Sequence, residues 1–416
     1  MYGKKQDYSL ESTELLMSAH LFDWLSLALR WSHIVAAIAW IGSSLYFMWL
    51  DAALERPAIG TDPSLEGSLW MVHSGGFYRV ERRKIGPGAM PSKLHWFKYE
   101  ALLTWLTGMC LVALIYYGRA ELYLIDPARM GWTPSQAILV SLGFLMGAWV
   151  VYDGVWNSKL AERSPRALTA LSIALVGVLG AVLCHIYSGR GAYIHLGAIL
   201  GTIMVLNVWV RILPAQQKMV DATAEGKVPD LTNSTKAKHR SVHNSYVTLP
   251  VLFTMISQHY PMTLGNERNA AVLFGIVLTG IVVRHAMIAI TYGRSARVAL
   301  ATAAVLVGAL FVVTMPKGSV ASRDVTPVQF SVIRGLVDKH CSSCHTLHPH
   351  DAGWPFPDPP QGLSFDQDQT IKDFAMGIKE RVADTRIMPL GNKTGITEDE
   401  RDTFRRWALD LQKPTP

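Results

Sequence analysis

The chain has 416 residues, enough for more than one domain, and half of them are hydrophobic while only 17% are charged. Such a composition is typical of a membrane protein, and four cysteines do not make a disulfide framework. The net charge is +7, but the basic residues lie in loops between apolar runs rather than on one soluble face. This distribution argues against nucleic acid as a partner and favours membrane lipid.

Eight apolar runs are long enough to cross a bilayer, which takes roughly 20 residues each. The fourth and fifth are joined only by Ser188, Gly189 and Arg190, which predicts an antiparallel hairpin. We therefore expect an all-α fold in which an eight-helix transmembrane bundle fills residues 1–315. The runs are residues 24–49, 97–117, 135–156, 167–187, 191–213, 242–260, 270–290 and 297–315.

Basic residues are distributed unevenly between alternate loops. The loops at 51–96, 157–166, 211–241 and 291–297 hold 17 Lys and Arg residues, whereas those at 118–134, 188–190 and 261–269 hold 4. Loops rich in Lys and Arg stay in the cytoplasm. The sequence thus predicts a bacterial inner-membrane protein with both termini on the periplasmic side. The longest loop, 51–96, is interpreted as a cytoplasmic hairpin with a lipid-facing basic cluster, residues 82–84.

A Cys-x-x-Cys-His motif follows the last apolar run. Cys341 and Cys344 are spaced so that each thiol reaches one vinyl group of a c-type haem, and His345 then lies under the ring as an axial ligand. A zinc site would need further ligands, and only His348 and His350 lie nearby. The motif therefore predicts one covalent haem c.

The second axial ligand should be a methionine. Met376 lies in a helical pattern and is interpreted as a core residue, whereas Met388 lies in an irregular loop beside Pro389 and Gly391. Such a loop brings a thioether sulfur across the haem face. We therefore expect His345 and Met388 to bind the iron, a pair that raises the reduction potential and makes the haem an electron acceptor.

The flanks of the motif complete a small helical cytochrome c domain, residues 327–416, after a linker at 316–326. Residues 327–339 have the apolar periodicity of a helix. Thr397 and Glu400 have the spacing of a capping box, which opens a last helix carrying Phe404 and Trp407.

Ionisable residues inside membrane spans mark functional sites. By position along the runs, His33, His185 and His195 lie near the outer side, together with Arg30 and His259; the inner set is Asp153, His243, Arg284 and His285. We expect the three outer histidines to approach one another and the inner residues to form a second cluster. Two interpretations stay open: bis-histidine binding of an additional b-type haem, or a substrate pocket with a proton route. Single histidines among them could also be interfacial.

Two runs resemble a known family. They are His-Trp-Phe-Lys-Tyr-Glu-Ala at 95–101 and His-Asn-x-Tyr-x-Thr-Leu-Pro at 243–250. The chain is similar to the bacterial membrane-bound urate oxidases, in which an eight-helix domain is fused to a C-terminal cytochrome c. The resemblance implies oxidation of urate with water to 5-hydroxyisourate, with electrons leaving through the haem instead of to O₂. The alternative is a quinol-linked membrane cytochrome b/c carrier without urate chemistry.

Urate is a flat anion rimmed by N–H and C=O groups, so its site should offer an aromatic face, polar partners, and a base of near-neutral pKa such as histidine. The inner set supplies these residue types, while the outer set lies nearer the haem. The sequence does not decide between the two layers. Urate loses two electrons and one haem accepts one, so the haem must be reoxidised between steps, by a soluble cytochrome or a terminal oxidase, unless a second redox centre exists.

Overall fold

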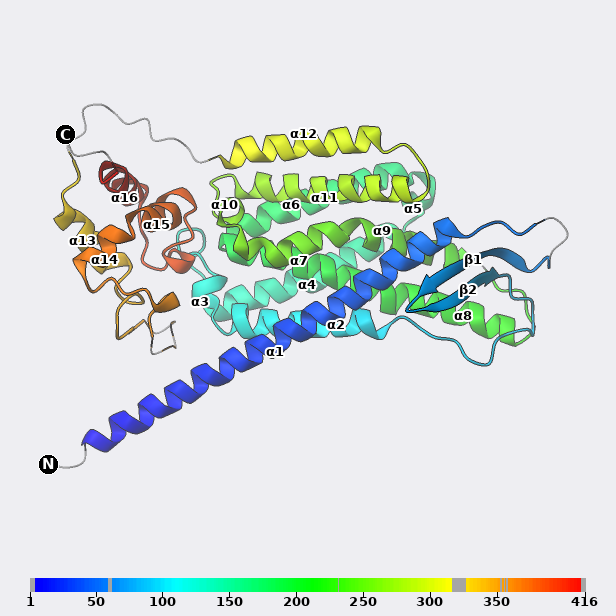
Figure 1. Cartoon of the computed structure of the whole chain (residues 1–416), viewed down its shortest axis with the longest axis horizontal. Helices are drawn as coiled ribbons and strands as arrows, with labels where there is room; N and C mark the ends of the chain where they lie inside the picture. The colour runs from blue at the N-terminus through cyan, green and yellow to red at the C-terminus, as the bar shows by residue number, and fades with distance from the viewer. Residues whose placement is uncertain are drawn as a thin grey trace.

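The computed structural model describes residues 4–58, 62–230, 232–315, 327–351, 354, 356 and 358–412, and these residues are mostly helical (Figure 1). The linker predicted at 316–326 lies outside them. The bundle runs from α1 to α12, and a C-terminal domain runs from α13 to α16. Seven helices of the described chain are long and apolar enough to cross a membrane.

The longer bundle helices are α1 (Lys4–Ala53), α2 (Tyr99–Leu111), α4 (Pro134–Trp156), α6 (Pro165–Ile186), α7 (Gly189–Leu206), α8 (Leu213–Ala224), α9 (Thr232–Ile256), α11 (Asn269–Thr291) and α12 (Arg297–Thr314). The π-helix η1 (Val112–Tyr117) extends α2, and η2 (Asn207–Ile212) joins α7 to α8. The short elements are α3 (Ala120–Tyr123), α5 (Lys159–Arg163), η3 (Ser257–His259) and α10 (Pro261–Leu264).

The eighth predicted span, 242–260, falls in α9 and η3, and its helix is not among the seven. The first half of α9 carries Lys236, Lys238 and Arg240, so its composition is too polar for an isolated span. The helix nevertheless packs against α7 and α11 inside the bundle. Contacts with these neighbouring helices therefore place this segment in the bundle.

The predicted hairpin of α6 and α7 is confirmed. The Ser188 hydroxyl accepts a hydrogen bond from the Gly191 amide at 3.0 Å and caps α7. The Ser188 amide also donates to the carbonyl of Leu124 at 2.9 Å, which fastens the turn to the segment after α3. α6 and α7 then pack side by side.

The all-α prediction is wrong for the loop at 51–96, which contains an antiparallel pair, β1 (Leu65–His73) and β2 (Gly76–Arg83). Ser74 and Gly75 both have positive φ, as two-residue hairpin turns require. The hairpin itself was expected, but the predicted lipid-facing basic cluster also forms ion pairs with acidic residues of the same loop. Arg82 pairs with Glu66 at 3.0 Å and Arg83 with Asp62 at 2.7 Å.

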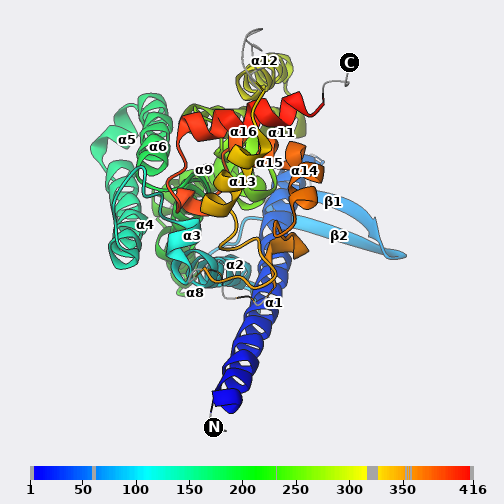
Figure 2. The same ribbon diagram turned by 90° about the vertical axis from the view of Figure 1, so that its left-hand side faces the viewer.

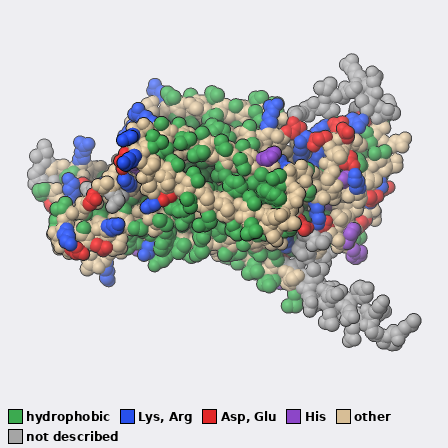
Figure 3. All heavy atoms as spheres, turned by 180° about the vertical axis from the view of Figure 1, so that it is seen from behind, with side chains coloured by type: hydrophobic (Ala, Val, Ile, Leu, Met, Phe, Trp, Pro, Cys, Tyr) green, Lys and Arg blue, Asp and Glu red, His purple; other side chains and the backbone are tan. Residues whose placement is uncertain are grey.

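The hairpin and α8 lie at one end of the bundle, and the C-terminal domain lies at the other (Figure 1). The basic loops at 51–96 and 211–241 are therefore on the side away from the C-terminal domain. On the face that Figure 3 shows, hydrophobic side chains form a broad band across the middle, and charged side chains gather towards the two ends. This is the surface pattern that a bilayer requires.

The C-terminal domain contains α13 (Phe330–His340), η4 (Pro360–Gly362), α14 (Asp368–Asp373), α15 (Ala375–Ile378), η5 (Lys379–Asp384), η6 (Leu390–Asn392) and α16 (Glu398–Asp410). The first and last helices, α13 and α16, pack together. Their contact buries Ile333, Val337, Phe404 and Trp407. The two helices predicted around the Cys-x-x-Cys-His motif are thus confirmed.

The predicted capping box opens α16. The Thr397 hydroxyl accepts from the Glu400 amide at 3.3 Å, and the Glu400 carboxylate accepts from the Thr397 amide at 2.8 Å. Burial by itself would raise the pKa of Glu400, but hydrogen bonds from Lys339, the Thr397 amide and His340 lower it to about 2. Glu400 thereby also links α16 to α13.

Thr397→Ala is expected to destabilise the C-terminal domain by about 1 kcal/mol, because loss of the cap leaves the Glu400 N–H at the helix start without its partner. The thermal unfolding midpoint of this domain in the purified protein should fall by several degrees. Thr403→Ala, in the middle of the same helix, is the control and should change the midpoint less. Equal midpoints for Thr397→Ala and the unchanged protein would contradict the role of this cap.

Candidate functional site

The Cys-x-x-Cys-His motif forms a tight turn directly after α13. The Cys341 amide donates to the Val337 carbonyl at 2.8 Å, and the His345 amide donates to the Cys341 carbonyl at 2.9 Å. The His345 ring nitrogen Nδ1 lies 2.9 Å from the carbonyl oxygen of Leu363. Because a carbonyl only accepts, Nδ1 carries the proton, and the Nε2 lone pair is left to bind a metal.

Met388 lies in the loop between η5 and η6, where two backbone hydrogen bonds hold it. Its amide donates to the Arg381 carbonyl at 3.1 Å, and its carbonyl accepts from Arg401 at 2.9 Å. Its side chain packs against the same hydrophobic cluster as Cys341. Met376 was expected in the core, but it is 39% exposed on α15. The contacts therefore favour Met388 as the second ligand.

The donor set of this segment fits a c-type haem: two unpaired thiols, an imidazole oriented through Nδ1, and a thioether in a fixed loop. A zinc site fits less well. Within the part of the chain that the structure describes, no group of three or more His, Cys, Asp or Glu side chains is arranged to hold a metal ion. When bound, haem c accepts and releases single electrons.

A small cavity of about 110 Å³ lies inside the bundle, between α1, α2, α7 and α9. This volume is well above the roughly 10–15 Å³ that a cavity needs to hold one water, so the cavity has room for a small ligand. Tryptophan, threonine and histidine side chains line it together with glycines and methionines. Its polar and aromatic lining residues are His33, Trp40, Thr104, Trp105, Thr248 and Thr254.

His33 is fixed at the wall of this small cavity. Its Nδ1 lies 3.0 Å from the carbonyl oxygen of Thr104 and 3.1 Å from the hydroxyl of Thr107. Since the carbonyl accepts, Nδ1 carries the proton and Nε2 is left as a base. The ring fits only because α2 has a glycine here: a β-carbon on Gly108 would lie 2.9 Å from the His33 ring.

The threonines of the small cavity donate their hydroxyl protons to their own helices. Thr104 donates to the carbonyl of Glu100, Thr248 to that of Asn244, and Thr254 to that of Val251, each at 2.7 or 2.8 Å. Their oxygen lone pairs are therefore available to accept hydrogen bonds from a ligand. The indole of Trp105 donates to Thr202 at 3.0 Å, which fixes a flat aromatic wall.

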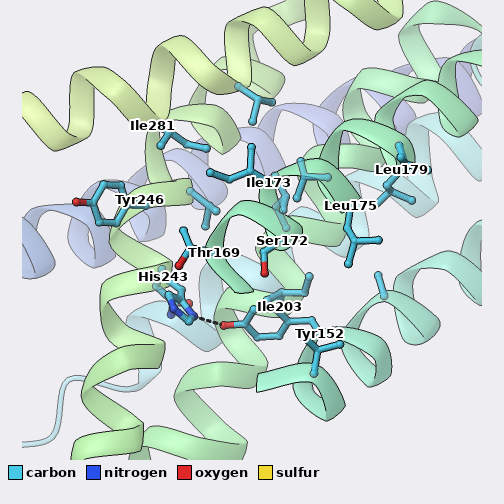
Figure 4. A pocket seen from close by; sticks show the side chains of 18 of the residues that line it. Tyr152, Thr169, Ser172, Ile173, Leu175, Leu179, Ile203, His243, Tyr246 and Ile281 are labelled. Atoms are coloured by element: carbon cyan, nitrogen blue, oxygen red, sulfur yellow. Dashed lines mark hydrogen bonds between the residues drawn. The ribbon is translucent and has the colours of Figure 1, made fainter. Parts of the chain in front are cut away.

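A second, much larger cavity of about 1190 Å³ lies between α4, α6, α9, α11 and α12, and its walls are mainly aliphatic (Figure 4). Polar groups gather in one part of it. Figure 4 shows the hydrogen bond between the Tyr152 hydroxyl and His243 Nδ1, which measures 2.8 Å. Asn207 donates to Tyr152 at 3.1 Å, and its own buried Oδ1 has no hydrogen-bond partner among the residues that the structure describes.

The outer histidines do not come together as expected. His195 is 1% exposed and stacks on Tyr187 at a ring distance of 5.3 Å, with Tyr116 and Tyr117 as its other ring neighbours. His185 is exposed on α6. Of the three, only His33 lines the small cavity, because His185 is exposed and His195 is enclosed by tyrosines.

The inner residues form separate pairs rather than one cluster. His243 and His285 both line the large cavity; His285 is exposed and binds Tyr246 at 2.8 Å. Arg284 is 2% exposed and donates to Ser245 at 2.7 Å. Asp153 pairs with Arg211 and with Arg240, the latter at 3.0 Å, so its charge is already compensated.

The histidine rings in the bundle have tyrosine and tryptophan rings as neighbours. Trp156 lies 4.1 Å from the His243 ring, and the rings of His195 and His285 stack on tyrosines. Among the described residues, no ring contact joins two histidines. Aromatic rings thus lie against each of these three imidazoles.

Sequence reasoning missed most of the small cavity. Thr248 lies in the distinctive run 243–250, so that run did carry a signal: its His and Asn face the large cavity, and its Thr faces the small one. Trp40, Trp105 and Gly108 gave no signal, because a single aromatic or glycine in an apolar run is ordinary.

Comparisons with known proteins identify one relationship. A model of the family described as urate oxidase N-terminal matches residues 19–315, which spans the bundle from α1 to α12. Neither the curated proteins nor the solved structures contain a match to this chain.

Proposed function

Since the chain belongs to the urate oxidase N-terminal family, we propose that it oxidises urate with water to 5-hydroxyisourate and passes the electrons to a haem c in its own C-terminal domain rather than to O₂. The family match over the whole bundle carries this proposal. The Cys-x-x-Cys-His motif and Met388 supply the electron acceptor, bound through Cys341, Cys344 and His345.

The small cavity is the better candidate for the urate site. Its size suits a small ligand, whereas the large cavity has about ten times the volume and aliphatic walls that suit lipid chains. Trp40 and Trp105 offer flat faces to a flat ring. The threonine oxygens accept hydrogen bonds from the N–H groups of urate. A ring without N–H groups at these positions would leave the threonine oxygens unpaired and would bind less well.

The polar groups of the small cavity lie nearer the C-terminal domain than those of the large cavity. On α9, Thr254 of the small cavity lies two residues before the helix ends at Ile256, about 3 Å at 1.5 Å per residue. His243 of the large cavity lies 13 residues before the end of α9 at Ile256, about 20 Å by the same measure. Electron transfer weakens steeply with distance, so the nearer site is favoured.

His33 is assigned as the general base. Its Nδ1–H is held by the Thr104 carbonyl, so Nε2 takes a proton as urate loses electrons. The overall change is urate plus water giving 5-hydroxyisourate, two protons and two electrons. Because one haem takes one electron, a downstream acceptor such as a soluble cytochrome or a terminal oxidase must reoxidise it between the two steps.

We place the protein in the bacterial inner membrane with the C-terminal domain on the periplasmic side. The basic loops lie at the opposite end of the bundle (Figure 1), and basic loops stay in the cytoplasm. Haem c is attached in the periplasm of bacteria, which is consistent with this orientation.

Anaerobic addition of urate to the purified protein tests the function. The absorption bands of reduced haem c should appear. One molecule of 5-hydroxyisourate should form for every two electrons that a downstream acceptor receives. A quinol in place of urate tests the quinol-linked carrier: reduction by quinol but not by urate would replace the present proposal with that one. A pyridine–haem assay should give one haem for each chain.

A further inference from the structure

The loop that carries Met388 contacts the bundle on two sides. We call residues 385–393 the methionine loop. Figure 1 shows the C-terminal domain beside the bundle end that carries α3 and α10, and Figure 2 looks onto that end, with α3 near the C-terminal helices. One side of the loop meets the turn between α10 and α11, residues 265–268, and the other meets α3 and the two residues that follow it.

The first contact depends on Gly265. A β-carbon at this position would lie 1.5 Å from the carbonyl oxygen of Thr385, so no other residue fits without moving the methionine loop. The φ angle of Gly265 is −89°, which any residue adopts, so the glycine is needed for the close approach alone. Beside it, Arg386 donates to the Glu267 carboxylate at 2.8 Å.

The second contact depends on Gly391. A β-carbon there would lie 2.8 to 3.2 Å from the carbonyl oxygens of Glu121, Leu122 and Ile125. Next to it, the Lys393 ammonium lies 3.8 Å from the Glu121 carboxylate. The methionine loop is therefore in backbone contact with the bundle both before and after Met388.

The C-terminal domain itself supplies a third anchor. Arg401 donates to the carbonyls of Val382 and Met388, the latter at 2.9 Å, and to the Asn392 side chain at 3.2 Å. Arg401 is 5% exposed, so these bonds are shielded from water. One face of the methionine loop is thus fixed by its own domain and the other by the bundle.

We propose that the bundle completes the haem site by holding the methionine loop in the position that brings Met388 to the iron, and that Gly265 is a positioning residue in this contact. The inference rests on the proposed ligand pair of His345 and Met388. A thioether is a neutral, weakly held ligand, so its binding depends on how well the loop is prepositioned. The domain contact thereby sets the reduction potential of the haem as well as its distance from the urate site.

Gly265→Ala in the full-length protein is the direct test. Its methyl group must displace Thr385, so ferric haem should lose the weak long-wavelength absorption band that methionine ligation gives, and the reduction potential should fall. Urate-driven reduction should slow by roughly a hundredfold, the cost typical of a displacement near 1 Å. The matched control is Gly131→Ala, in the loop before α4, where an added β-carbon meets nothing within 4 Å.

A second variant keeps the test decisive if the Gly265→Ala protein does not fold or does not bind haem. Glu267→Gln removes the negative charge that pairs with Arg386 and adds no bulk, so it should lower the potential by less. If both variants keep the long-wavelength band and the potential of the unchanged protein, the bundle does not position Met388 and the proposal is wrong. The band and potential need no urate, so failure of the unchanged protein to oxidise urate would instead overturn the proposed function.

Discussion

Replacing His33 with glutamine should slow urate-driven reduction of the haem by about 10² to 10⁴-fold, the usual contribution of a general base. Glutamine keeps a side-chain amide that hydrogen bonds to the Thr104 carbonyl, so the packing beside Gly108 should survive. The glutamine amide is not basic enough to accept a proton from urate. Reduction by dithionite should stay normal, because the haem itself is unchanged.

His185→Gln is the matched control. His185 was predicted from the sequence to join the same layer as His33, but its side chain is exposed on α6 and does not line the small cavity. Its variant should reduce the haem with urate at the normal rate. If His33→Gln also did so, the small cavity would not be the catalytic site, and His243→Gln would then test the large cavity.

The features predicted correctly are those that depend on residues close together in the sequence. Apolar runs of about 20 residues locate the spans, and Thr397 with Glu400 locates the start of α16. A hairpin was predicted in the loop at 51–96, but its two strands at residues 65–83 were not, because glycine interrupts their alternating pattern. α9 is too polar at its start to stand as a span by itself, and only its neighbours α7 and α11 explain its place.

The site could be predicted only in part, because its contacts join distant segments. His33 and the Thr104 carbonyl are 71 residues apart, and Tyr152 and His243 are 91 apart. Position along a run gives the depth of a histidine but not the direction in which its helix turns it. His33 and His185 were therefore equivalent in sequence and differ in the structure. The haem segment was easier, since Cys341, Cys344 and His345 are neighbours in the chain.

Replacing Met388 with alanine should keep the haem covalently attached, because the thioether bonds come from Cys341 and Cys344. The loss of the sulfur ligand should remove the long-wavelength band of ferric haem and lower the reduction potential. Each fall of about 59 mV costs a factor of ten in a one-electron equilibrium. Urate should then reduce the haem to a smaller extent and more slowly, while dithionite still reduces it fully.

Met376→Ala is the control that makes this result specific to Met388. Both methionines follow His345 in the sequence, but Met388 packs against the cluster that contains Cys341, whereas Met376 is 39% exposed on α15. The Met376 variant should therefore keep the band and the potential. A lowered potential in Met376→Ala, together with an unchanged one in Met388→Ala, would move the iron ligand to Met376. The contacts at Gly265 and Gly391 between the bundle and the methionine loop would then hold a loop that does not bind the iron.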